Sequence, residues 1–157
     1  PEGPGREHAL NYAVFQRVAR DLAAATGWAA SVPDPSLRAN SEVAIARSWS
    51  VQEAQGATAW AAGIPDPDGR TAALKTTLLK WAEVNPAAAA QWIGQRGATA
   101  ANEEIFKSVT SGLAGAHPSV RELWLNSTTH PGWRAAGEQI LRNTQDDSRR
   151  KGARPKS

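Results

Sequence analysis

The segment WAASVPDPSLR at residues 28–38 recurs as WAAGIPDPDGR at residues 60–70, a shift of 32 in sequence number. The tryptophans extend this spacing, because one series of them occupies positions 28, 60, 92 and 124. A second series is formed by Trp49, Trp81 and then Leu113, at positions with the same spacing. Self-similarity at a fixed interval is typical of repeat architectures, so the sequence predicts a tandem repeat with a period of 32.

Two kinds of helix-start signal occur in the repeats. Asn85 before Pro86 predicts a first helix that runs to the region of Gly97, because Asn caps the first turn and Pro tolerates its first position. Asp34-Pro35 and Asp66-Pro67 predict the start of a second helix. Apolar residues spaced by three and four give this helix one buried face, formed by Leu74, Leu78 and Trp81 and then by Ile105, Val109 and Leu113. No segment alternates with a period of two, so we predict no strands.

Two short helices per repeat predict an all-α fold, a right-handed or HEAT/TPR-like solenoid of about nine short helices. In such a fold each helix pair buries its apolar face only against neighbouring pairs. A tryptophan ring covers roughly 150–250 Å² and fills the volume that small Ala side chains leave between close helices. We therefore expect the repeat core to be formed by Trp28, Trp49, Trp60, Trp81, Trp92 and Trp124.

The repeat domain is predicted to span residues 1–145, as a half-repeat at 1–17, repeats at 18–49, 50–81 and 82–113, and a capping repeat at 114–145. Gln145 indicates the cap, since it stands where earlier repeats have Trp49, Trp81 or Leu113. The half-repeat carries Leu10, Val14 and Phe15, an apolar face that suits pairing with another copy. Because the sequence starts inside a repeat and contains no Met, we expect it to be a fragment or processed product of a longer protein.

Composition and charge exclude several classes of protein. The 157 residues contain no Cys, which excludes disulfides, thiolate metal sites and Cys nucleophiles. No apolar stretch approaches the roughly 18 residues that a membrane-spanning helix needs. Residues 146–157 carry five basic and two acidic side chains and so account for the net charge of +3. This segment has almost no apolar residues, and we predict a disordered basic tail.

The motifs W-A-x(3)-P-D-P at 60–67 and W-A-x-x-N-P-A-A-A-A-Q-W at 81–92 resemble a class of tandem helical repeats in bacterial proteins, with a consensus near W-A-x-x-D-P-x-A-A-x-W. The resemblance covers residues 1–145 and implies a helical repeat without implying an activity. The layout is similar to that of tetratricopeptide repeats. Their period is 34, however, and their W-x-x-L-G-x-x-Y start is not present here, so their peptide binding is not carried over.

Four residues are candidates for binding a partner. Arg38, Arg70 and Arg134 share one repeat position, with Asn102 in the third repeat, and could form a ladder of donors for carboxylates or phosphates. The alternative is that each Arg pairs with a loop Asp such as Asp34 or Asp66, or stacks on a Trp. Trp133 lies outside the tryptophan series and next to Arg134, a combination that binding hot spots favour. Its alternative role is packing within the cap.

No motif for catalysis, a metal or a cofactor is present. His8, His117 and His130 are far apart, and His117-Pro118 is typical of a helix start. We therefore expect no enzyme activity, no cofactor and no metal. The leading hypothesis is a non-catalytic scaffold that binds a protein or peptide, or a repeat region of a longer bacterial protein. The alternatives are binding of nucleic acid or another anionic surface through the basic tail, and an accessory arm of an enzyme encoded upstream.

Overall fold

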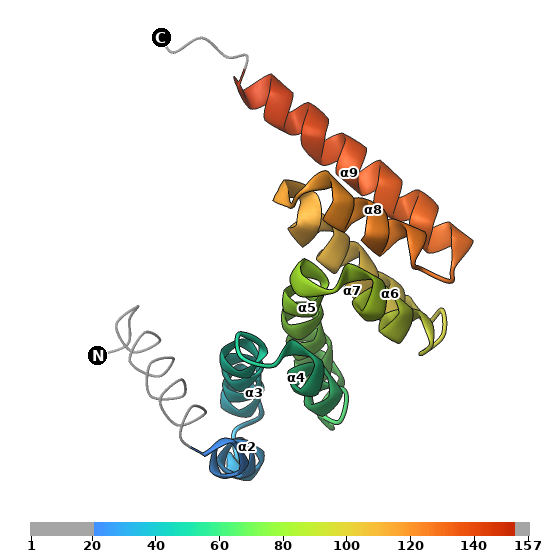
Figure 1. Ribbon diagram of the computed structural model, residues 1–157. Coiled ribbons are helices and arrows are strands. Elements are labelled where there is room, and N and C mark those ends of the chain that lie inside the picture. Colours follow the sequence, from blue (N-terminus) through green and yellow to red (C-terminus); the bar gives the residue numbers. More distant parts are fainter. Residues whose placement is uncertain (1–20, 153–157) are drawn as a thin grey trace, which may run out of the picture. The chain divides into compact units, whose positions relative to one another are not determined.

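The computed structural model describes residues 21–152 and is all-α over this range (Figure 1). It contains eight α-helices and one short 3-10 helix, and no strand is found between residues 21 and 152. The all-α prediction is confirmed, while the predicted half-repeat at 1–17 lies outside the described residues. The helices are α2 (Leu22–Ser31), α3 (Pro35–Ser50), α4 (Ala54–Ala61), α5 (Pro67–Val84), α6 (Pro86–Gly94), α7 (Ala100–Gly112), η1 (Leu113–Gly115), α8 (Pro118–Asn126) and α9 (Pro131–Gly152).

Helices α2, α4, α6 and α8 begin at residues 22, 54, 86 and 118. In each case the side chain of the preceding residue accepts a hydrogen bond from a free amide of the first turn, which stabilises the helix start. The predicted start at Asn85-Pro86 is confirmed, since Asn85 Oδ1 accepts from the Ala88 amide at 3.2 Å. The capping residues are Asp21, Glu53, Asn85 and His117.

The longer helices α3 and α5 begin at the two Asp-Pro pairs, as predicted. Asp34 Oδ1 accepts from the Leu37 amide at 2.7 Å, and Asp66 Oδ2 accepts from the Gly69 amide at 2.6 Å. Helix α7 has no Asp-Pro pair and is capped instead by Thr99. The loop before it turns at Gly97, whose φ of 85° lies in the left-handed region that glycine tolerates best.

The predicted apolar face of the second helices is buried. Leu74, Leu78 and Trp81 of α5 are at most 8% exposed, and Ile105, Val109 and Leu113 are each 1% exposed. The spacing of three and four residues therefore identified the buried face correctly. Leu113 lies in η1, just after α7 ends.

The described chain divides into two compact units, unit 1 (Pro1–Lys80) and unit 2 (Trp81–Ser157), with the division inside α5. The sequence predicts one repeat domain over 1–145. The division falls next to the predicted boundary between the repeats 50–81 and 82–113. Each unit has its own core.

The core of unit 1 is built from small residues. Ala25 and Ala29 of α2 pack with Ile45 of α3, and all three are at most 1% exposed. The half-buried rings of Trp28, Trp49 and Trp60 pack against this cluster. Close approach of α2 and α3 is possible because Ala presents only a methyl group at the contact.

The core of unit 2 is built from aromatic rings. Phe106 of α7 stacks on Trp124 of α8 with ring centroids 4.9 Å apart, and on Trp133 of α9 at 5.3 Å. The Trp124 indole Nε1–H donates to Thr110 Oγ1 at 2.8 Å, which satisfies the polar atom of a fully buried ring. Helix α9 crosses this core at Gly137, where a Cβ atom would lie 2.5 Å from a methyl group of Leu125.

The segment predicted to be a disordered tail is helical over residues 146–152. Helix α9 continues to Gly152, although Leu141 is the last buried residue of its described part. Arg and Lys have favourable helix propensities, and extending an existing helix costs far less than starting one. Helix α9 therefore continues past the predicted boundary at 145, and residues 153–157 lie outside the described range. Among residues 21–152, no helix is long and apolar enough to cross a membrane.

Candidate binding surface

Trp133, a predicted binding residue, is buried in unit 2. Its side chain is 3% exposed and stacks on Phe106, and its ring lies 4.5 Å from that of His130. The neighbouring Arg134 points to solvent, so the two residues do not form a joint hot spot. The alternative role for Trp133, packing within the last predicted repeat, is the one that its burial supports.

The guanidinium group of Arg70 forms a hydrogen bond within the chain. Its Nη1 donates to the carbonyl oxygen of Ile64 at 2.9 Å, in the loop before α5. Asn102, 32 residues further along the chain, makes similar contacts, because its Nδ2 donates to the carbonyl oxygen of Arg96 at 3.1 Å and to that of Gly97 at 2.9 Å. This repeat position therefore ties the end of one helix to the start of the next, a structural role that the sequence pattern alone does not indicate.

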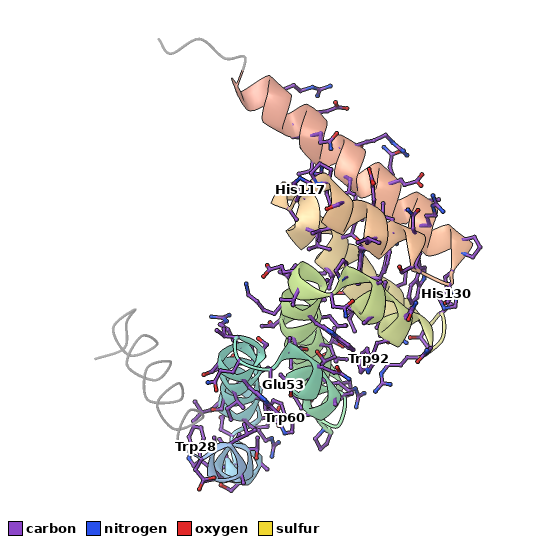
Figure 2. The ribbon with its side chains drawn as sticks, viewed as in Figure 1. Trp28, Glu53, Trp60, Trp92, His117 and His130 are labelled. Carbon is purple, nitrogen blue, oxygen red and sulfur yellow. The ribbon has the colours of Figure 1, made fainter. Side chains whose placement is uncertain are left out.

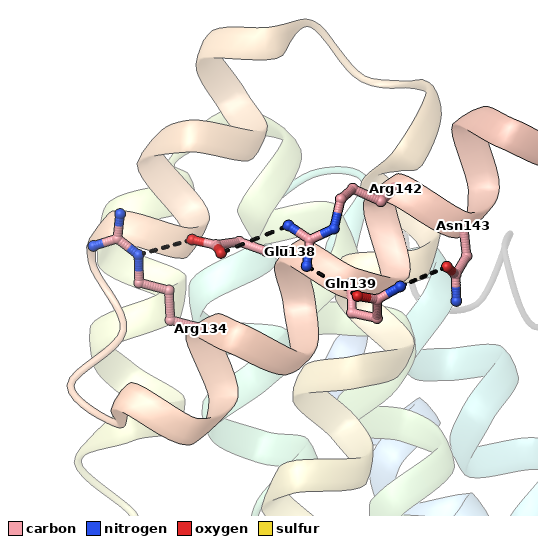
Figure 3. Close-up of polar contacts among 5 residues, drawn as sticks. All are labelled: Arg134, Glu138, Gln139, Arg142 and Asn143. Carbon is pink, nitrogen blue, oxygen red and sulfur yellow. Dashed lines mark hydrogen bonds and ion pairs between the residues drawn. The ribbon is translucent and has the colours of Figure 1, made fainter.

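Arg38 and Arg134 are each close to a carboxylate on their own helix. Arg38 lies near Glu42, one turn further along α3. Arg134 Nε donates to Glu138 Oε1 at 3.2 Å, and Arg142 Nη1 lies 3.9 Å from the other oxygen of Glu138 (Figure 3). The three residues continue with Asp146 and Arg150 at a spacing of four, so charges alternate in sign along this face of α9. Such a row compensates its own charge and is typical of an exposed helix face.

Gln139 joins the same exposed surface of α9. Its Nε2 donates to Asn143 Oδ1 at 2.7 Å, and its Oε1 accepts from Arg142 Nη2 at 3.0 Å (Figure 3). These contacts are solvent-exposed, and each contributes about 0.2–0.5 kcal/mol to helix stability, as is usual for a pair at this spacing. Arg38, Arg70 and Arg134, which were predicted to offer free donors, therefore each have a polar group of the same chain nearby.

The six tryptophans of the predicted core differ in their burial. Trp124 is completely buried and Trp81 is 8% exposed, whereas Trp28, Trp49, Trp60 and Trp92 are half-buried. Two pairs recur at equivalent repeat positions, since Trp49 lies 6.2 Å from Trp60 and Trp81 lies 6.2 Å from Trp92. Figure 2 shows Trp28, Trp60 and Trp92, which lie in α2, α4 and α6 respectively.

Helices α2, α4 and α6 contain no charged side chain. Their sequences are LAAATGWAAS, AQGATAWA and PAAAAQWIG. On each helix one side is buried, and the other side exposes small or neutral residues, namely Ala23, Gly27 and Ala30 on α2, Gln55 and Ala59 on α4, and Gln91 on α6. Cores of protein interfaces are depleted of charged residues, and α3, α7 and α9 by contrast carry many charges. Sequence reasoning missed this surface, although the absence of charge from these segments was available as a signal.

The large apolar residues that the structure exposes are scattered. They are Leu37, Val51, Val84 and Leu123, with exposed fractions between 43% and 84%. Each lies in a different helix or loop, and single exposed apolar residues are normal on protein surfaces.

The two histidines in the described range have structural contacts. His117 caps α8, as its helix-start motif predicted, with Nδ1 2.8 Å from Ser119 Oγ. His130 Nε2 lies 3.1 Å from the carbonyl oxygen of Gly94 and so connects the start of α9 to the end of α6. Within residues 21–152, no group of three or more His, Asp or Glu side chains is arranged to hold a metal ion.

Glu42 is a buried acid that sequence reasoning did not single out. The residue is 5% exposed, and its Oε2 atom is buried without a hydrogen-bond partner. Burial raises the pKa of the Glu42 carboxyl group, with the nearby Arg38 charge opposing that shift and Asp66 adding to it. A signal existed in the sequence, because Glu42 shares its repeat position with Leu74 and Phe106, both of which are buried.

No protein-family model, no curated protein and no solved structure matches this chain.

Proposed function

We propose that the chain is a non-catalytic scaffold of helix-pair repeats that binds a partner protein through the uncharged outer faces of helices α2, α4 and α6. The observation that carries this proposal is the contrast between helix types. Helices α2, α4 and α6 are free of charge over their whole length, while the second helices carry most of the charged residues. A surface that only contacts water has no reason to exclude charge, whereas the centre of an interface does.

The repeat architecture of this proposal is supported by the helix starts. The first helices begin at a constant interval along the chain, and each start is capped by the side chain before it. Equivalent positions on their exposed sides differ from repeat to repeat, with Gly27, Ala59, Gln91 and Leu123 directly before each tryptophan. Scaffolds of stacked helix pairs use this kind of variation, in which buried positions repeat and exposed positions differ, to select a partner.

Binding to nucleic acid or another anionic surface receives less support. Arg70 donates to a backbone carbonyl, and Arg134 and Arg142 share the carboxylate of Glu138. Strong binding to nucleic acid needs Lys and Arg side chains that neutralise phosphates and so release the counterions of the nucleic acid. An arginine that is already paired with a carboxylate on its own helix is less suited to this role. The proposal therefore places the partner contact on the uncharged helices and not on α9.

The proposal is tested by placing a photo-crosslinking residue at position 59 on α4 or position 91 on α6 of the full chain in its source cells. The matched control is position 135, an exposed Ala on α9. We expect one discrete protein adduct from positions 59 and 91 and none from position 135. Ala59→Glu should reduce the affinity of the purified partner at least tenfold, while Ala135→Glu leaves it unchanged.

Two results would contradict the proposal. One is an adduct that forms at position 135 and not at 59 or 91, which would place the partner on the charged helices. The other is an affinity that is insensitive to Ala59→Glu in a chain whose far-UV circular dichroism is unchanged.

A further inference from the structure

Glu42 occupies a place in α3 that apolar residues occupy in the other second helices. It is the eighth residue of α3, as Leu74 is of α5, and Phe106 of α7 follows Leu74 at the same repeat interval. All three residues are at most 5% exposed. A carboxyl group in a position otherwise filled by Leu and Phe breaks the hydrophobic pattern, and such departures from local consistency mark sites with a role of their own.

The carboxyl group of Glu42 borders the first turn of α5. Glu42 Oε2 lies 3.1 Å from the point where a Cβ atom on Gly69 would be, and Asp66 Oδ2 lies 3.1 Å from the same point. The Gly69 amide already donates a hydrogen bond to Asp66 Oδ2 at 2.6 Å, so it is not available as a donor to Glu42. Glu42 Oε2 is left buried without a partner.

The charges that act on Glu42 come from two elements. Arg38 lies on α3 itself and favours the ionised form, and Asp66 at the start of α5 favours the protonated form. Burial also favours the protonated form, because an ionised carboxylate loses its water without gaining a hydrogen bond. The protonated group carries no charge toward Asp66, and its hydroxyl is a donor that the carboxylate form lacks.

We propose that Glu42 and Asp66 form a pH-sensitive contact that holds α3 against the first turn of α5 while Glu42 is protonated and loosens when Glu42 ionises. Gly69 is part of this contact, since any side chain there would displace one of the two carboxyl groups. The contact lies within unit 1 and does not depend on the function proposed above. The equivalent position in unit 2 is Phe106, which has no ionisable group, so unit 2 does not contain this contact.

The pH dependence follows from the raised pKa of Glu42. The folded chain holds this proton more tightly than the unfolded chain does. The stability that Glu42 contributes is therefore fully present below its ordinary pKa and is lost as the pH rises through its higher pKa in the fold. Glu42→Gln removes this loss, because Gln stays uncharged at every pH.

The test uses the full 157-residue chain in two measurements. Carboxyl ¹³C NMR follows the titration of Glu42, and thermal unfolding is recorded between pH 4 and 8 for the wild type and for Glu42→Gln. We expect Glu42 to titrate above the ordinary pKa of a glutamate, and the Gly69 amide shift to follow the same titration. We expect Glu42→Gln to raise the melting temperature by about 2–4 °C at pH 8, with a smaller difference at pH 4. The matched control Glu122→Gln should change it equally at both pH values.

The Asp66→Asn variant distinguishes the effect of the Asp66 charge on Glu42 from the effect of burial alone. Asn keeps the capping acceptor for the Gly69 amide but removes the charge that opposes ionisation of Glu42. We expect Glu42 to titrate at lower pH in this variant. The proposal is overturned if the pKa of Glu42 is not raised above that of an ordinary glutamate, if the Asp66→Asn variant leaves the Glu42 titration unchanged, or if the effect of Glu42→Gln is the same at pH 4 and pH 8. The NMR titration of the wild type decides the matter even if a variant fails to fold.

Discussion

Trp60 of unit 1 and Trp124 of unit 2 occupy the same turn of helices α4 and α8, yet their surroundings differ. Trp60 is half-buried and meets Trp49 at a tilted angle with ring centroids 6.2 Å apart. Trp124 is fully buried, stacks on Phe106 and donates to Thr110. The positions equivalent to Phe106 and Thr110 in unit 1 are Glu42 and Ala46. One spacing of helices is thus compatible with an aromatic core and with a core of small residues that includes an acid.

The largest expected effect in this comparison is that of Trp124→Ala. Removing a fully buried ring from the stack should lower the free energy of unfolding by about 3–5 kcal/mol. Trp60→Ala should cost roughly half as much, because part of that ring remains in contact with water in the folded chain. Urea unfolding followed by far-UV circular dichroism measures both, with the two Trp→Phe variants as controls for ring size. Equal losses for the two Ala variants would contradict the difference in burial described here.

A smaller effect is expected where α9 crosses the aromatic core. In Gly137→Ala the new Cβ would meet Leu125 at 2.5 Å, and overpacking of this kind typically costs about 1–3 kcal/mol. The control is Gly132→Ala in the first turn of the same helix, where no atom lies within 4 Å of the new Cβ. We expect Gly132→Ala to leave the melting temperature unchanged or raise it and Gly137→Ala to lower it. If both variants melt at the same temperature, the crossing at Gly137 is not as close as the structure shows.

The smallest expected effect concerns the caps that start α4 and α6. Asn85→Ala removes a favoured capping side chain and should cost about 1 kcal/mol. Glu53→Ala at the equivalent position should cost less, since Glu is not among the favoured caps and its side chain is exposed. Thermal unfolding of the two variants compares them directly. A larger loss for Glu53→Ala would show that the capping carboxylate in unit 1 has a role beyond its hydrogen bond to Gly56.

Local features of the fold were predictable because they depend on residues close in sequence. The starts of α3, α5 and α6 follow from Asp-Pro and Asn-Pro pairs, whose side chains reach amides three residues later. The buried faces of α5 and α7 follow from apolar spacing within one helix. The end of α9 was not predictable in the same way, because composition alone suggested disorder and did not show that a packed helix would extend into the segment.

The candidate site was predicted less well, for a physical reason that Arg70 and Trp133 illustrate. The sequence places Arg70 at a repeating position, but only the folded loop brings the Ile64 carbonyl to its guanidinium. The sequence places Trp133 beside Arg134, but only the packing of α9 on Phe106 turns the ring inward while Arg134 stays in solvent. Which groups remain available for a partner depends on contacts between helices, which no local pattern encodes.

The sequence by itself determined that the chain is helical, where α3, α5, α6 and α8 begin and which face of α5 and α7 is apolar, because propensity, capping and periodicity act over a few residues. The tertiary structure alone decided how deeply each tryptophan is buried, that the contacts gather into two units, and that Glu42 lies unpartnered beside Asp66. These properties depend on the side chains that meet across helix contacts. The same tryptophan spacing therefore gave a half-exposed ring at Trp60 and a buried one at Trp124.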